Sequence, residues 1–327
     1  MRRNSAIVVM GVLTLLGGGI FAGATAAAPK GDACAKRGDA LGVSRVVEID
    51  TANGPRFGKT PTGDYDILAD GEIVLTFDDG PLRPYTPAVL NALEAHCTKA
   101  TFFMVGRMAV SDPAMVKEVA KRGHTIAGHT WSHAKLQTVP LEKAKDEIEL
   151  GFSAIASALG KPIAPFFRFP YLRTSKPALG YLKSRGIASF AINIDSRDFE
   201  TRNPNTMQQT VLAQLTKARK GILLFHDIQP STAKGLNGLL AELKARGFKV
   251  VHFVPKSTVK TLPDYDTIAH REIARRRVAT ADQPVTSPPR GISSAKAGQE
   301  VLPWAKPASQ GAKNSATKNG HNAKGDQ

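Results

Sequence analysis

Glu72-Ile73-Val74-Leu75-Thr76-Phe77 is a short apolar, β-branched stretch bounded by Gly71 and Gly80, and it leads directly into Asp78-Asp79. Such a run predicts a buried strand. Two adjacent acids within a strand would point to opposite faces, but at a turn such as Gly80-Pro81 both can face one cavity. In parallel α/β folds, catalytic groups gather at the carboxyl ends of strands. The stretch therefore predicts an α/β fold with acids at its functional edge.

A second motif, His129-Thr130-Trp131-Ser132-His133, follows later in the chain. Histidines four residues apart on a helical turn lie on one side of it, as ligands of a divalent transition metal do. One aspartate and two histidines supply three ligands and leave a position open for water. The second aspartate can then act as a base on that water. An isolated Asp-Asp-Gly is commonly a solvated turn, but the two motifs together indicate a metal-activated hydrolytic site.

The middle of the chain alternates short apolar strands with helical patterns. Gly123, Gly160, Gly186 and Gly247 are typical helix ends. Seven strands alternating with helices predict a parallel (β/α) barrel, complete or incomplete, rather than an antiparallel sandwich. We expect strands at 72–77, 100–105, 125–128, 165–169, 188–194, 221–226 and 249–253, helices near 86–96, 112–122, 140–159, 175–185, 206–219 and 234–246, and an irregular or hairpin extension over 41–70.

The amino terminus has the pattern of a secretory signal. A basic start is followed by an apolar run to about residue 22 and by the small-x-small sequence Ala24-Thr25-Ala26. We expect cleavage after Ala26 and a secreted or periplasmic protein. An uncleaved membrane anchor is the alternative, which the length of the run barely permits.

Cys34 and Cys97 are the two cysteines of the chain. An even number in an exported protein makes a Cys34–Cys97 disulfide the expectation, with two buried thiols as the alternative.

The carboxyl-terminal region is basic and poor in residues that build a core. From His270 onward there are ten lysines and arginines against four acids, within a formal net charge of +16 for the chain. We expect a mostly disordered tail, disordered beyond about residue 280 and with a short helix around 272–277, that contacts an anionic envelope surface electrostatically. Export and the lack of interleaved aromatic residues argue against nucleic acid, and a solvated tail without function is the alternative.

Further polar groups follow the later predicted strands. Arg168 and Pro170-Tyr171 come after the fourth, Asp195 and Asp198 after the fifth, and His226 ends the sixth. The alternative for Arg168 is a structural ion pair, and the alternative for His226 is a core histidine.

The ordered set T-F-D-D-G, H-T-W-S-H, R-F-P-Y, D-S-R-D-F and L-F-H, within residues 72–254, resembles the polysaccharide deacetylase family, carbohydrate esterase family four, also called the NodB-homology family. The resemblance implies a distorted (β/α) barrel over 71–262. It also implies removal of N-acetyl or O-acetyl groups from polysaccharides with a divalent metal, commonly zinc or cobalt. We expect the segments 1–26, 27–70 and 263–327 to be the signal peptide, an extension packed on the barrel and the tail.

By the same resemblance each motif position has a role. Asp79, His129 and His133 match the metal ligands, Asp78 the general base, Arg168 the residue that tethers the base, Tyr171 the backbone donor to the oxyanion, His226 the general acid, Asp198 the residue that orients the acid, and Leu224 the lining of the acetyl pocket. Asp195 competes with Asp198 for the orienting role, and we favour Asp198 because it precedes the aromatic Phe199. Phe199 stands where the family usually has tryptophan, and Phe169 where proline is frequent; neither position belongs to the metal or acid–base set that the resemblance implies.

These features favour a metal-dependent hydrolase acting on the N-acetyl groups of N-acetylglucosamine polymers such as peptidoglycan, another envelope glycan or chitooligosaccharide. An O-acetyl polysaccharide esterase with the same site is the alternative, and a catalytically silent glycan-binding module is the third. A zinc protease is disfavoured because Thr130 stands where its general-base glutamate would be. An iron oxygenase shares the ligand set but leaves the second aspartate and His226 unexplained.

Overall fold

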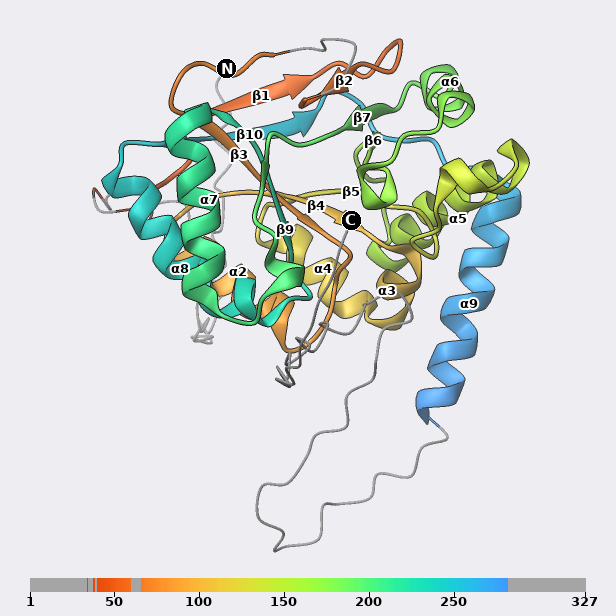
Figure 1. Ribbon diagram of the computed structural model, residues 1–327. Coiled ribbons are helices and arrows are strands. Elements are labelled where there is room, and N and C mark those ends of the chain that lie inside the picture. Colours follow the sequence, from red (N-terminus) through yellow and green to blue (C-terminus); the bar gives the residue numbers. More distant parts are fainter. Residues whose placement is uncertain (1–33, 35–37, 39, 60–65, 282–327) are drawn as a thin grey trace, which may run out of the picture. The chain divides into compact units, whose positions relative to one another are not determined.

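The computed structural model describes residues 34, 38, 40–59 and 66–281, and the side chains among them up to residue 276 (Figure 1). The predicted signal peptide and most of the predicted tail lie outside these residues. No helix of the described part is both long and apolar enough to cross a bilayer.

The chain divides into two units, residues 1–38 and 39–327, and only Cys34 and Gly38 of the first are described. Neither Cys34 nor Cys97 is a free thiol, because each is disulfide-bonded.

A parallel sheet of ten strands forms the centre of the second unit, as far as the chain is described. Its order is β1-β10-β3-β4-β5-β6-β7-β2, with β9 paired to β3 and β8 paired to β9. β1 and β2, at the two ends, each pair with a single neighbour, so hydrogen bonds do not close the barrel. The strands are β1 (Arg45–Ile49), β2 (Arg56–Phe57), β3 (Glu72–Asp78), β4 (Thr101–Met104), β5 (Thr125–Gly128), β6 (Phe166–Phe167), β7 (Ala188–Phe190), β8 (Ile194–Asp195), β9 (Gly221–His226) and β10 (Lys249–Pro255).

Helices pack around the sheet, with α2, α7 and α8 gathered on one side and α3, α4 and α5 on another (Figure 1). Their starts follow local chemistry: Asp112 accepts a 3.0 Å hydrogen bond from Met115 N, and Pro113 opens α4 without needing a backbone donor. The helices are α2 (Tyr85–Ala95), α3 (Gly106–Ser111), α4 (Pro113–Lys121), α5 (Leu141–Leu159), α6 (Lys176–Ser184), α7 (Pro204–Ala218), α8 (Pro230–Ala245) and α9 (Pro263–Ala281), with short 3₁₀ turns η1 (Leu136–Thr138), η2 (Pro170–Leu172) and η3 (Asp198–Glu200).

β3 is buried on both faces, which explains its continuous apolar sequence. Ile73, Leu75 and Phe77 belong to the outer core that packs against the helices, whereas Val74 belongs to the inner core of the barrel. Because side chains alternate along a strand, Thr76 and Asp78 share the inner face with Val74. The sequence of β3 thus places Asp78 at the inner edge of the sheet.

The predicted α/β barrel of parallel strands is confirmed, with local differences. The expected strand 188–194 is two strands, β7 and β8, because the chain leaves its pairing with β6 and pairs with β9 instead. The extension over 41–70 contributes β1 and β2 to the parallel sheet, where we expected an irregular segment or a hairpin. α3, a helix of six residues, was not predicted.

α9 corrects the predicted start of the tail at residue 263. It spans Pro263–Ala281, where we expected only a short helix at 272–277. Tyr265 donates a 2.8 Å hydrogen bond to Asp146 of α5, and Ala269 and Ile273 are buried. The packed domain therefore extends past residue 262. The spacing of Tyr265, Ala269 and Ile273 carried this signal, which the high charge of the segment masked.

Candidate active site

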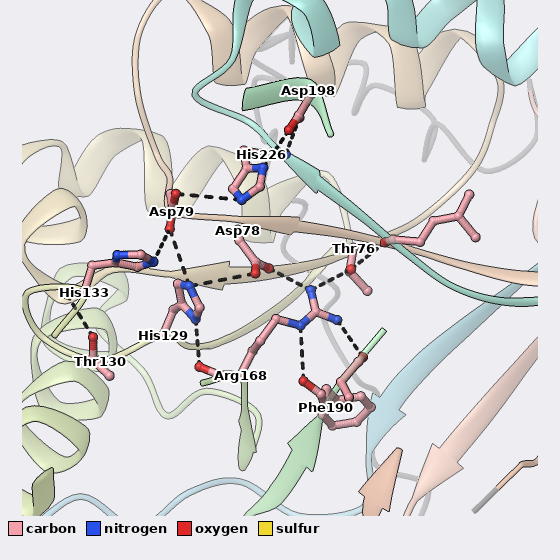
Figure 2. Close-up of polar contacts among 12 residues, drawn as sticks. Thr76, Asp78, Asp79, His129, Thr130, His133, Arg168, Phe190, Asp198 and His226 are labelled. Carbon is pink, nitrogen blue, oxygen red and sulfur yellow. Dashed lines mark hydrogen bonds and ion pairs between the residues drawn. The ribbon is translucent and has the colours of Figure 1, made fainter. Parts of the chain in front are cut away.

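The two carboxylates of the first motif lie at the carboxyl end of β3, both almost fully buried. Asp78 is the last residue of the strand and faces the barrel interior. Asp79 adopts φ +78°, a left-handed conformation that is uncommon for a residue with a Cβ. This turn of the backbone brings the second carboxylate beside the first (Figure 2), as expected for a strand end.

His129 and His133 approach Asp79 from the loop after β5. Their rings lie 5.0 Å apart, centre to centre. The loop is not helical, so the expectation that a helical turn aligns the pair is wrong. Thr130 and His133 both have positive φ, and the Thr130 hydroxyl accepts a 2.9 Å hydrogen bond from His133 N. The irregular turn of this loop therefore brings both imidazoles to one side, as the sequence spacing suggested that a helical turn would.

Asp79, His129 and His133 form a cluster that fits a divalent cation. Asp79 Oδ1 lies 3.3 Å from His133 Nε2 and 3.4 Å from His129 Nε2, and the three ligand atoms are within 4.8 Å of one another. Oδ1 is buried and lacks a hydrogen-bond partner in the described part of the chain. His129 Nδ1 contacts the Arg168 carbonyl at 2.7 Å, so it donates there and leaves the lone pair of Nε2 toward Asp79.

The charge states also suit a metal. Burial lowers the pKa of His133 to about 4, although Asp79 opposes this, so the ring is neutral at pH 7. Burial raises the pKa of Asp79, but His129, His133 and His226 together lower it by a larger amount. The resulting pKa is below the ordinary value of an aspartate. Two imidazoles and one carboxylate are a donor set that transition metals prefer.

Arg168 holds the other carboxylate. Its Nη1 donates to Asp78 Oδ1 and to Thr76 Oγ1, each at 2.7 Å, and its guanidinium lies 4.2 Å from the centre of the Phe103 ring. Burial lowers the pKa of Arg168, while Asp78 raises it. Asp78 Oδ2 accepts no hydrogen bond from the described residues and lies 3.8 Å from His129 Nε2. One oxygen of Asp78 is anchored and the other faces the cluster.

His226 and Asp198 form a second acid–base pair. Asp198 Oδ1 contacts His226 Nδ1 at 2.7 Å, and its Oδ2 accepts from His226 N at 2.7 Å and from the Thr232 hydroxyl. Asp195 instead accepts a 2.9 Å bond from Arg197 N. The geometry thus favours Asp198 over Asp195 as the partner of His226.

His226 Nε2 faces the metal-ligand cluster, at 4.0 Å from Asp79 Oδ2 (Figure 2). Burial lowers the pKa of this histidine, but Asp198, Asp79 and Asp78 raise it more, to about 10. A protonated imidazole at neutral pH can give a proton to a departing group.

Two exposed aromatic rings flank the cluster. The Tyr171 ring lies 4.6 Å from the His133 ring, and the Phe199 ring lies 5.8 Å from the His226 ring. Tyr171 and Phe199 are 42% and 54% exposed as whole residues. Leu224, two residues before His226 on β9, is buried. Tyr171, Phe199 and Leu224 are the residues that the sequence predicts to contact the substrate.

Three residues of the site were not identified from the sequence. Thr76 bonds Arg168, Thr232 bonds Asp198, and Asp227 lies beneath the turn that follows Asp79. The two-residue spacing of Thr76 and Asp78 on one strand was a signal for the first. Thr232 and Asp227 depend on packing between distant segments, for which the sequence offers no comparable pattern.

Comparison with known proteins agrees with this geometry. A family model described as polysaccharide deacetylase matches residues 67–190. The chitooligosaccharide deacetylase of Azorhizobium caulinodans is 32% identical over 195 residues, which cover 54% of this chain and 90% of that protein. The peptidoglycan-N-acetylglucosamine deacetylase of Listeria monocytogenes is 32% identical over 179 residues, 55% of this chain but only 37% of the relative.

Among solved structures, a peptidoglycan deacetylase of Bdellovibrio bacteriovorus superposes with a TM-score of 0.60 and 35% identity, covering 68% of this chain and 61% of that one. The motif order predicted the same family. With a relative matched over nearly its whole length, the chain belongs to the polysaccharide deacetylase family, carbohydrate esterase family four.

Proposed function

We propose that this protein is an exported, metal-dependent deacetylase that hydrolyses N-acetyl groups of N-acetylglucosamine in an envelope glycan, with peptidoglycan as the first candidate. One observation carries the proposal: a base and an acid border the same three-ligand cluster. Asp78 Oδ2 lies 3.8 Å from His129 Nε2, and His226 Nε2 lies 4.0 Å from Asp79 Oδ2. A glycan-binding module would not need this pair.

Asp79, His129 and His133 would hold the cation, with zinc as our first choice and cobalt as another candidate. Such an ion supplies Lewis-acid polarisation of the acetyl carbonyl and lowers the pKa of bound water toward ~7.

Asp78 acts as the general base. Arg168 holds its Oδ1 and so fixes the direction of Oδ2, which takes a proton from the attacking water. A bond forms between the water oxygen and the acetyl carbon, and negative charge develops on the former carbonyl oxygen. The Tyr171 backbone N–H is our candidate donor to that oxygen, a contribution of about 3–4 kcal/mol for a well-placed donor.

His226 acts as the general acid. The carbon–nitrogen bond breaks when His226 Nε2 gives its proton to the sugar nitrogen, so that acetate and a free amine leave. Asp198 fixes the orientation of the ring through Nδ1 and keeps the imidazolium favourable. An ester needs less help from an acid, because an alkoxide leaves more readily than an amide anion, so the presence of this pair supports N-deacetylation over the O-acetyl esterase alternative.

The substrate is proposed to be a polymer of N-acetylated sugars. Tyr171 and Phe199 offer apolar faces on which sugar rings can pack, on the His133 side and the His226 side respectively. The named activities of the relatives, on peptidoglycan and on chitooligosaccharides, support the same class.

The test measures acetate release from peptidoglycan, chitooligosaccharides and acetylated xylan, with metal-stripped and zinc-reloaded protein. We expect release from an N-acetylated glycan that disappears on stripping and returns on reloading. Equal rates with stripped and reloaded protein would refute metal dependence, and release from acetylated xylan alone would favour the esterase.

Export and the tail are part of the proposal. The basic start, apolar run and Ala24-Thr25-Ala26 support cleavage after Ala26, which sequencing of the mature amino terminus tests; a terminus at Met1 would favour the membrane anchor.

The basic residues after 281 support contact with an anionic surface. A chain truncated after Ala281 should bind anionic cell-wall polymer more weakly than the full chain, with a difference that shrinks as salt rises.

A further inference from the structure

Asp227 is a buried acid that the proposed reaction does not use. It follows His226, is 1% exposed, and its Oδ1 has no hydrogen-bond partner in the described part of the chain. No described lysine or arginine forms an ion pair with it. A carboxyl group in such a place must be compensated by other contacts, and those contacts indicate what it does.

Its contacts converge on the turn that follows Asp79. The Thr86 hydroxyl donates to Asp227 Oδ2 at 2.6 Å and accepts from Leu82 N at 2.8 Å. At the other end of the turn, the Asp227 carboxylate lies directly against Gly80, where a Cβ would collide with both of its oxygens. The acid therefore contacts Gly80 directly and Leu82 through Thr86, so it braces both ends of the three-residue turn.

This turn controls a strained residue. Asp79 has φ +78°, and a residue with a Cβ keeps such a conformation only where its surroundings impose it. On the sheet side, Asp79 N donates to Phe103 O at 3.2 Å and Val105 N donates to Gly80 O at 3.3 Å. These bonds fix the turn against β4 alone. Asp227 and Thr86 fix it from the opposite side, where β9 meets α2.

We propose that Asp227 is a positioning residue for the metal site: by bracing the turn 80–82 against Thr86, it holds Asp79 in the conformation that directs its carboxylate to His129 and His133. The inference rests on the proposed metal site and is independent of which glycan is deacetylated. Because Asp227 also follows His226 directly, the same contact ties the position of the general acid to that of the metal ligand.

The test measures zinc and cobalt affinity by chelator competition on the metal-stripped full-length protein. Thr86→Val keeps the shape of the side chain but removes the hydroxyl between Leu82 and Asp227, and Thr86→Ser retains that hydroxyl. We expect Thr86→Val and Asp227→Ala to bind metal about 10- to 100-fold more weakly, the range for residues that orient metal ligands, and Thr86→Ser to stay within about threefold of wild type.

Ser153→Ala is the matched control. Ser153 is fully buried on α5, and its hydroxyl lacks a hydrogen-bond partner in the described region, so its loss removes a buried hydroxyl but no contact with the turn. Circular dichroism of the stripped proteins establishes which variants are folded. If Asp227→Ala does not fold, the Thr86 pair decides the matter.

Three results would overturn the inference. The first is a folded Thr86→Val variant with wild-type metal affinity, and the second is metal binding weakened equally in Thr86→Val and Thr86→Ser. The third is a variant of Asp79 that binds metal as tightly as the wild type. Failure of the proposed function would give a different result. The wild type would bind metal, Thr86→Val would bind it more weakly than Thr86→Ser, and the wild type would release no acetate from any glycan.

Discussion

The two ends of β3 carry carboxylates bonded in different ways. At its start, Glu72 Oε1 accepts a hydrogen bond from Arg45 Nε at 2.7 Å, and Oε2 accepts one from Arg45 Nη2 at 2.6 Å. Ala69 N also donates to Oε2. At its end, Asp78 receives Arg168 on Oδ1 alone, and Oδ2 faces the metal-ligand cluster. Both are guanidinium–carboxylate pairs on one strand, but only the second leaves an oxygen available for chemistry.

Asp198 extends the comparison to the active site itself. Although it lies beside His226, the proposed general acid, both its oxygens are bonded, to His226 and Thr232. By this criterion it resembles Glu72, a residue that holds others in place, more than Asp78. The number of engaged oxygens thus separates Asp78 from Glu72 and Asp198, although it does not separate Asp78 from Asp227, whose Oδ1 is also unengaged.

The largest expected effect is that of Asp78→Asn. An amide can still accept from Arg168 but cannot take a proton, so kcat should fall by about 10²–10⁴, the usual contribution of a general base. The counterpart Glu72→Gln should leave kcat within about twofold. Steady-state acetate release per folded molecule checks both, because the unpaired charge of buried Arg168 also destabilises Asp78→Asn. Equal losses in the two variants would break the comparison.

A smaller effect is expected for Asp198→Asn. Removing this charge takes away the first of the interactions that raise the pKa of His226 to about 10. His226 must be protonated to act, so activity is lost as pH rises through its pKa. The alkaline limb of the kcat profile should therefore move to lower pH, by about one unit or more, with kcat at its optimum about 10- to 100-fold lower.

Asp78→Asn serves as the control for that pH profile, since it removes a base and should abolish the acidic limb. A wild-type profile without an alkaline limb around pH 10, the pKa of His226, would contradict its assignment as the general acid, and an unmoved alkaline limb in Asp198→Asn would show that Asp198 does not set the pKa of His226.

Much of this site was predictable because it is built from strand ends. Asp78, Arg168 and His226 each follow or end an apolar run, and in a parallel barrel such positions converge on one rim. The chain order of the motifs then identified the family. The convergence of these residues and the family can both be inferred from the local sequence and the parallel topology alone, and both inferences were correct.

The remaining features depend on contacts that local sequence does not encode. The histidine pair relies on positive φ at Thr130 and His133, which is supported by the close approach of Gly151 to the Thr130 backbone. β1 pairs with a strand near the other end of the chain, Arg45 opposite Val251. No periodicity in residues 41–70 announces such a partner, so that segment was read as irregular.

The third prediction concerns Glu72, at the start of β3. Hydrogen bonding to Arg45 is the main cause that lowers the pKa of Glu72 to about 2 from 4.5, against the opposing effect of burial. A carboxylate with a depressed folded-state pKa stabilises the fold above its unfolded pKa and loses that effect as pH falls. Glu72→Gln should therefore lower the free energy of unfolding by about 1–2 kcal/mol at pH 7, after discounting the half-exposed Arg45.

The difference between wild type and Glu72→Gln should shrink between pH 4.5 and about 2, the two pKa values that bound the effect. Urea unfolding at several pH values measures it. A difference that stays constant across that window would mean that the charge of Glu72 contributes nothing and that the variant acts through packing alone.

The smallest effect is expected for Phe199, a rim residue without charge. The residue is 54% exposed, and its ring lies edge-to-face with the ring of His226, so it contacts the acid without a hydrogen bond. If it serves as a sugar platform, Phe199→Ala should raise KM about three- to tenfold and leave kcat nearly unchanged, consistent with aromatic contacts of about 0.5–1.5 kcal/mol. Phe199→Trp, the residue usual in the family, should lower KM because a larger face packs on the sugar. A fall in kcat with constant KM would instead assign Phe199 to the His226 pair, and the rim would then contain a positioning residue that the count of engaged oxygens cannot detect.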